Sequence, residues 1–177
     1  MPSKRGAGEC LFCRRISDPS QRGPLVYEDP LVLAAHQLEA RGETYRGAIV
    51  IQTRRHTAGG LPDLTEEEGE RIGWLVVRIS RALREVVGAG WTYTYCFTEG
   101  FRHVHQFVVA RYPETPARHV RLGLTDWKRA PRGGPAEIRG LARQLRSRIG
   151  GPKRRRSASK LRPPASRPEQ VGALSQR

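Results

Sequence analysis

The run HVHQFVV at residues 103–109 constrains the fold of this chain more than any other part of its sequence. We predict that it forms a β-strand. Because side chains alternate between the two faces of a strand, His103, His105 and Phe107 then share one face and Gln106 takes the other. Two imidazoles on one face can bind a metal, and they can also supply a nucleophile or a general acid and base near neutral pH.

Cys10 and Cys13 form a Cys-x-x-Cys pair. With this spacing a tight turn presents two thiolates to one zinc ion, which fills half of a tetrahedral site. His56 and His103 are available as the other two ligands, and His105 then stays free for chemistry. The alternative is that both cysteines are free thiols near the start of the sequence.

The order of these motifs resembles that of the histidine triad superfamily of nucleotide hydrolases and transferases. The sequence contains Cys-x-x-Cys, then VYED at 26–29, an apolar strand that ends in RRH at 54–56, a long helix, and His-φ-His followed by φ-φ-x-Arg-x-Pro, where φ is an apolar residue. Each motif is weak alone, whereas their order and spacing make the combination specific. The resemblance covers residues 10–149.

The resemblance implies an α+β fold in a homodimer. It also implies that the middle histidine, His105, attacks the α-phosphate of a nucleotide, with a purine nucleotide or a dinucleoside polyphosphate as the expected substrate. In relatives that carry zinc, the ligand positions map to Cys10, Cys13, His56 and His103. We expect this zinc to be structural, because four protein ligands leave no coordination position open for water or substrate.

Three parts of the family pattern differ in this chain. Position 107, where the third histidine belongs, is Phe, which cannot donate a hydrogen bond to a phosphate or a leaving group. The Gly-Gln-Ser segment that contacts phosphate is replaced by FTEGFR at 97–102, and the position of the ribose-binding aspartate falls near His36 and Gln37. The leading hypothesis is a nucleotide hydrolase or nucleotidyltransferase that forms a phosphohistidine on His105. The alternative is a catalytically impaired, zinc-stabilised protein that binds nucleotide or nucleic acid.

Cationic groups must offset the charge that builds up on the phosphoryl oxygens during such a reaction. Arg102 and the pair Arg54 and Arg55 are predicted near the mouth of the site, with ordinary solvated arginines as the alternative. Phe107 is predicted to stack against a base or to close the pocket. Gln106 faces away and is not expected to replace the missing histidine.

The hydrophobic pattern predicts a five-stranded, mainly antiparallel sheet with one long and one C-terminal helix. The predicted strands cover residues 24–27, 31–35, 47–52, 91–97 and the strand that carries His103. Thr65 and Glu68 match a capping box at the start of the long helix, whose apolar positions recur at helical spacing up to Gly88. The second helix is predicted over 135–149. We expect residues 115–134 to be loop-rich, with Trp127 docking the loop.

The net charge of +15 is unevenly distributed. Residues 151–177 hold eight basic side chains and one acid, so they contribute +7. Their proline and serine content predicts a disordered basic tail, which either contacts nucleic acid weakly or only solubilises the chain. The remaining divisions are a flexible N-terminus at 1–9 and one domain at 10–150. No apolar run reaches the length of a membrane span and no signal peptide is evident, so we expect a cytoplasmic protein.

Overall fold

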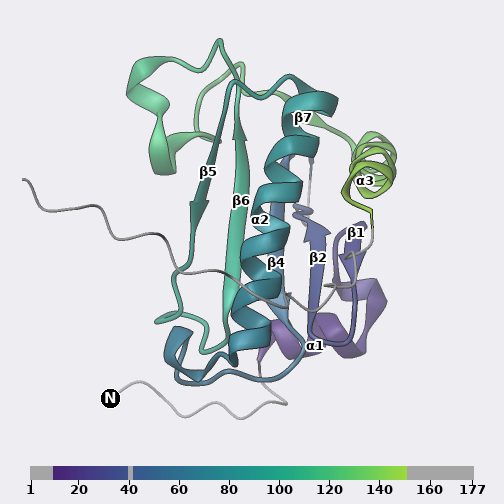
Figure 1. The fold of residues 1–177 in the computed structure, drawn as a ribbon. Helices are drawn as coiled ribbons and strands as arrows, with labels where there is room; N and C mark the ends of the chain where they lie inside the picture. The colour runs from purple at the N-terminus through teal and green to yellow at the C-terminus, as the bar shows by residue number, and fades with distance from the viewer. Residues whose placement is uncertain (1–9, 40–41, 151–177) are drawn as a thin grey trace, which may run out of the picture.

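The structure, a computed structural model, describes residues 10–39 and 42–150. Five strands form one antiparallel sheet in the order β1-β2-β4-β6-β5 (Figure 1). These strands are β1 (Leu25–Glu28), β2 (Val32–His36), β4 (Ala48–Thr53), β5 (Trp91–Tyr95) and β6 (His105–Arg111). β4 lies in the centre of the sheet, and all six of its residues are buried. The predicted five-stranded antiparallel sheet is therefore confirmed.

Two helices cover one face of this sheet (Figure 1). They are α2 (Glu66–Val87) and α3 (Pro135–Ile149). The capping box predicted for α2 is present: the Thr65 hydroxyl accepts from the Glu68 amide at 3.2 Å, and the Glu68 carboxylate accepts from the Thr65 amide at 2.9 Å. Leu75 and Ile79 of α2 are fully buried in the same core as Ile51 and Val108 of the sheet. Both predicted helices are confirmed.

The opposite face of the sheet is partly covered by a third helix, α1 (Leu11–Ser17), which the sequence did not predict. The Cys-x-x-Cys pair was expected in a tight turn, but Cys10 caps this helix and Cys13 lies in its first turn. Phe12 is the buried residue of α1, and it packs with Val50 and Phe107. One buried residue in a seven-residue helix leaves no apolar periodicity, which explains why the pattern was missed.

Strand β6 begins two residues later than predicted. His103 lies before the strand, in a turn where its amide donates to the carbonyl of Phe101 at 2.6 Å instead of joining the sheet. His105 and Phe107 share one strand face as predicted, and they oppose Gln52 and Val50 of β4. The turn still places the His103 side chain in the interior, since it is fully buried.

The loop-rich segment between β6 and α3 contains one element that was not predicted. Arg132 and Gly133, which fall in this segment, form the short strand β7 (Arg132–Gly133), which pairs antiparallel with β3 (Thr44–Tyr45). Two residues per strand are too few for a periodic signal. Trp127 agrees with its predicted role, because it is buried and its indole N–H donates to the carbonyl of Leu124 at 3.0 Å.

His36, at the end of β2, is a buried structural histidine. Its Nδ1–H donates to the carbonyl of Gln37 at 2.6 Å, and its Nε2 accepts from the amide of Gly47 at 2.9 Å, so the ring is neutral. Gly47 has a φ of 84°, and a Cβ there would lie 2.9 Å from that of Ala110. Glycine is therefore required beside this imidazole. Burial, assisted by the charge on Arg46, lowers the pKa of His36 to about 4.

This buried ring predicts a loss of stability in acid. A histidine whose pKa falls from 6.5 when unfolded to about 4 when folded stabilises the fold above pH 6.5. This contribution to the free energy of unfolding is lost as the pH falls, and the loss reaches about 3 kcal/mol at pH 4. Denaturant unfolding of the wild type and of His36→Gln at pH 7 and pH 4.5 measures it, because the other titrating groups are common to both proteins. Equal losses of stability in the two proteins would contradict this assignment.

Within residues 10–39 and 42–150, no helix combines the length and the hydropathy needed to cross a bilayer. The predicted flexible N-terminus at 1–9 and the predicted basic tail at 151–177 lie outside the described residues. The division into these segments and one domain at 10–150 stays a prediction.

Candidate metal and active site

Four side chains converge between α1, the end of β4 and the start of β6. The ligand atoms of Cys10, Cys13, His56 and His103 all lie within 4.8 Å of one another. The Nδ1 of His103 is 3.5 Å from each of the two sulfur atoms, and the Nδ1 of His56 is 3.3 Å from the sulfur of Cys13. The cluster could hold a metal ion, and these are the four residues predicted from the sequence.

Hydrogen bonds fix the His103 ring in the form that a metal requires. Its Nε2 lies 2.8 Å from the backbone carbonyl of Thr53, which can only accept, so the proton is on Nε2. The Nδ1 atom therefore presents a lone pair to the two sulfurs. A ligand histidine commonly donates its second N–H to a carbonyl in this way. The hydroxyl of Thr57 supports the same turn, because it accepts from the amide of Val104 at 2.7 Å.

The spacing of the cluster fits a tetrahedral zinc ion. Zinc–sulfur bonds of about 2.3 Å and zinc–nitrogen bonds of about 2.05 Å place sulfur and nitrogen roughly 3.6 Å apart. The three measured sulfur–nitrogen distances, 3.3 to 3.5 Å, are close to this value. Two sulfurs and two imidazole nitrogens are also a ligand set that zinc prefers. Burial and the neighbouring Cys10 raise the pKa of the Cys13 thiol to about 11, and a bound cation reverses such a shift.

His105 lies beside this cluster and presents a free nitrogen. Its Nδ1 lies 2.8 Å from the backbone carbonyl of His103, so Nδ1 carries the proton and Nε2 keeps its lone pair. Burial lowers the pKa of His105, and the charge on Arg15 acts in the same direction, while the hydrogen bond to His103 opposes them. The ring is therefore neutral at pH 7, which is the state that a nucleophilic imidazole needs.

Aromatic rings surround His105. Its ring stacks on that of Phe12, with centroids 4.2 Å apart, and it meets the edges of Phe101 at 6.0 Å and Phe107 at 5.6 Å. Phe107 stacks in turn on Tyr95 at 5.0 Å. His105 is 3% exposed. Sequence reasoning did not identify Phe12, because the turn predicted for the Cys-x-x-Cys pair gave this residue no defined direction.

The three arginines proposed from the sequence are engaged elsewhere. Arg54 forms an ion pair with Glu28 at 3.0 Å, and Arg55 forms one with Glu68 at 2.7 Å. Arg102 is exposed, and its Nε donates to the carbonyl of Ala58 at 3.1 Å. A substrate role for Arg102 stays a prediction.

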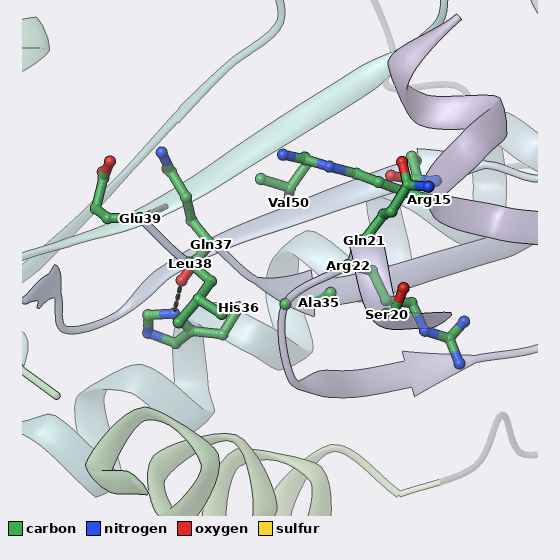
Figure 2. A pocket seen from close by; sticks show the side chains of 12 residues that line it. Arg15, Ser20, Gln21, Arg22, Ala35, His36, Gln37, Leu38, Glu39 and Val50 are labelled. Carbon is green, nitrogen blue, oxygen red and sulfur yellow. Dashed lines mark hydrogen bonds between the residues drawn. The ribbon is translucent and has the colours of Figure 1, made fainter. Parts of the chain in front are cut away.

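A pocket of about 310 Å³ opens on the sheet face that carries α1 (Figure 2). Val50 and Gln52 of β4 line it, and these two residues oppose Phe107 and His105 in the sheet. The rest of the wall comes from α1 and the turn after it on one side and from the end of β2 on the other. These other residues are Arg15, Ser20, Gln21, Arg22, Gly23, Ala35, His36, Gln37, Leu38 and Glu39. Two residues of the pocket wall therefore lie on the strand that pairs with the strand carrying His105.

Comparison with solved structures identifies the fold. The chain is similar to a zinc-bound histidine triad family protein from Mycobacterium smegmatis, with a TM-score of 0.56 and 23% identity over 81% of this chain and 95% of that chain. A Hit-like protein involved in cell-cycle regulation from Bartonella henselae matches with a TM-score of 0.56 and 18% identity over 79% and 96%.

A hypothetical histidine triad nucleotide-binding protein from Sulfolobus tokodaii matches with a TM-score of 0.59 and 17% identity, covering 79% of this chain and 91% of that chain. No protein-family profile and no curated protein matches the sequence. At these identities the comparisons show a fold, and that fold is the histidine triad fold predicted from the motifs.

Proposed function

We propose that this protein is a nucleotide hydrolase or nucleotidyltransferase that acts at the α-phosphate through His105. One observation carries the proposal: the neutral imidazole of His105 has its Nδ1–H bonded to the carbonyl of His103, so that Nε2 is left unprotonated, and Gln52, which opposes His105 in the sheet, lines a pocket of about 310 Å³. The nucleotide-binding protein of the same fold from Sulfolobus tokodaii supports this substrate class. Release of a nucleoside monophosphate by the wild type, and its loss in His105→Ala, test the proposal.

The proposed reaction has two displacements at phosphorus. In the first, Nε2 of His105 bonds to the α-phosphorus, and the bond from phosphorus to the leaving group breaks with its electron pair. The carbonyl of His103 stabilises the positive charge that the ring then acquires. In the second, water or an acceptor phosphate attacks phosphorus, the phosphorus–nitrogen bond breaks, and neutral His105 is restored. The attacking water releases a proton to the solvent, and the leaving group takes up a proton from the solvent.

Zinc completes the proposal as a structural ion held by Cys10, Cys13, His56 and His103. All four positions of a tetrahedron are then filled by side chains, so the ion would tie α1 to the end of β4 and the start of β6. The zinc-bound histidine triad protein from Mycobacterium smegmatis supports the choice of metal. The residues of this chain do the chemistry, and the metal fixes the segment next to His105.

A purine nucleotide or dinucleoside polyphosphate substrate, a homodimer and a cytoplasmic location belong to the same proposal. β5 is an edge strand, and its Trp91 is 67% exposed. An exposed edge strand with a large aromatic side chain suits pairing with a second copy of the chain.

Phe107 favours a second candidate function, a zinc-stabilised protein that binds nucleotide or nucleic acid without turning it over. Phe107 stands where the family pattern has its third histidine, and a phenyl ring cannot protonate a leaving group. The basic tail that would extend such binding to nucleic acid lies outside the described residues.

Phe107→His separates the two candidates. An amine leaving group must be protonated as it departs, and a positioned acid accelerates such steps about 10²- to 10⁴-fold. We therefore expect Phe107→His to raise the hydrolysis of an adenosine phosphoramidate about 100-fold and to change the hydrolysis of diadenosine tetraphosphate little. Steady-state release of AMP measures both rates, and Phe107→Leu, which removes the ring without adding a donor, is the matched control.

Three outcomes of this experiment have distinct meanings. A wild type that binds AMP but turns over neither substrate, together with an active Phe107→His, favours the binding protein. Equal acceleration of both substrates would show that the Phe107 side chain limits access to His105. The lack of a proton donor at position 107 would then not be what slows the wild type. A rise in Phe107→Leu as large as in Phe107→His would lead to the same conclusion.

A further inference from the structure

Arg15 connects the pocket to the His105 site. Its side chain reaches from α1 over Val50 (Figure 2). Its guanidinium carbon lies 5.5 Å from the centroid of the Phe12 ring, and the same ring stacks on His105. Arg15 and the imidazole that we propose as the nucleophile therefore both contact the Phe12 ring.

In the part of the chain that the structure describes, no acidic side chain pairs with Arg15. Its Nε atom is buried and has no hydrogen-bond partner, and among residues 10–39 and 42–150 no acid lies within ion-pair distance of it. Zinc bound by two thiolates and two neutral imidazoles would form a neutral unit, so it would not compensate this charge. A partly desolvated cation without a partner is costly, and an anionic ligand removes that cost.

The two sides of the pocket differ in charge. Arg15 and Arg22 lie on the side formed by α1 and the turn after it, whereas Gln37 and Glu39 lie on the other side (Figure 2). A nucleotide matches this arrangement with its phosphate toward Arg15 and its hydroxyl and amino groups toward Gln37 and Glu39. The volume of about 310 Å³ lies at the lower end of the range of small-molecule sites.

We propose that Arg15 binds the phosphate group of the substrate beside His105. The inference rests on the proposed function and adds to it the residue that supplies the positive charge. Phe107 cannot donate to the phosphate, and Arg54 and Arg55 are held in ion pairs, so Arg15 is, besides Arg102, a further cation that can offset the charge on the phosphoryl oxygens. Arg15 lies on α1, the helix that also carries Cys13 and has Cys10 as its N-cap.

A comparison of phosphorylated and unphosphorylated ligands tests this role. Calorimetry on the zinc-loaded full chain measures the affinity for AMP, GMP, CMP and UMP and for the four corresponding nucleosides. For the nucleotide that binds most tightly, we expect Arg15→Gln to weaken binding roughly 10- to 100-fold, because a hydrogen-bonded charge is lost. Affinity for the corresponding nucleoside should change less than about threefold, since it lacks the phosphate.

Arg14→Gln is the matched control, because Arg14 is the adjacent residue on the same helix, carries the same charge and is exposed. It should bind the nucleotide as the wild type does. Arg15→Lys keeps the charge but loses the planar pair of donors, so it should recover only part of the affinity. Zinc content and melting temperature are measured for every variant. If Arg15→Gln does not fold, Arg15→Met, which also removes the charge, provides the same comparison.

The outcomes separate this inference from the proposed function. If none of the four nucleotides binds to the wild type, both the proposed function and the role of Arg15 are overturned. If a nucleotide binds and Arg15→Gln binds it as tightly as the wild type, only the role of Arg15 is overturned. An equal loss of nucleotide and nucleoside affinity would also overturn it, because Arg15 would then shape the pocket without recognising phosphate.

Discussion

His105→Ala is expected to lower nucleotide turnover at least about 10³-fold while leaving the fold intact. The imidazole is itself the nucleophile, so the variant cannot form the phosphohistidine. Both displacement steps of the proposed reaction are then lost together. The hydrogen bond of the His105 side chain is local: its Nδ1–H donates to the carbonyl of His103, two residues away, and so it does not hold another helix or strand in place. Release of nucleoside monophosphate from diadenosine tetraphosphate measures the loss.

Gln106→Ala is the control for this experiment. Gln106 is the next residue of β6, faces away from His105 and donates to the Thr94 hydroxyl at 2.5 Å, so its removal should leave turnover within about twofold. Rapid quenching of the wild type with a labelled nucleotide should trap a nucleotidyl group on the peptide that contains His105. Retained turnover in His105→Ala, or a label on another peptide, would contradict the mechanism and leave the fold unaffected.

The sheet, the long helix and the cluster of two cysteines and two histidines could be predicted because each has a local signature. Continuous apolar residues predicted β4, a capping box predicted the start of α2, and Cys-x-x-Cys with two histidines predicted the cluster. The alternation rule placed His105 and Phe107 on one face correctly. It did not predict that His103 lies in a turn before β6, because a strand and a turn can both bury one histidine.

The pocket and its cation could not be predicted, since they depend on where α1 docks. The sequence around Arg15 has no helical periodicity, so nothing local indicates that this arginine extends over the sheet while Arg14 faces solvent. Arg54 and Arg55 were predicted near the mouth of the site because they adjoin His56 in sequence. Their side chains instead form ion pairs with Glu28 and Glu68. Proximity in sequence is a poor guide for long charged side chains, because the surrounding acids decide where they point.

Removing a zinc ligand is expected to have the largest effect on stability. Cys10→Ser and His56→Ala should both release the metal and lower the melting temperature by at least about 10 °C, since structural zinc contributes about 10–16 kcal/mol of binding free energy in small peptides. The two variants should behave alike although one residue is the N-cap of α1 and the other follows β4, because each leaves the same incomplete site. Elemental analysis of protein purified without added zinc should give one zinc per chain.

Cys96→Ser is the matched control for the loss of a thiol. Cys96 is partly buried and follows β5, and it is not one of the four residues of the metal cluster, so its replacement should keep the zinc and most of the stability. A zinc content near zero in the wild type, or a similar fall in melting temperature for Cys96→Ser and Cys10→Ser, would remove the metal site from the proposal.

Loss of zinc should also lower activity, but indirectly. The metal would hold α1 against the sheet, and α1 carries both Phe12, which stacks on His105, and Arg15, which lines the pocket. Release of the helix therefore removes the phosphate-binding cation while the nucleophile stays on β6. We expect Cys10→Ser, assayed below its melting temperature, to lose nucleotide affinity more than the rate at saturating substrate. A variant that loses rate alone would indicate that the metal acts in the reaction itself.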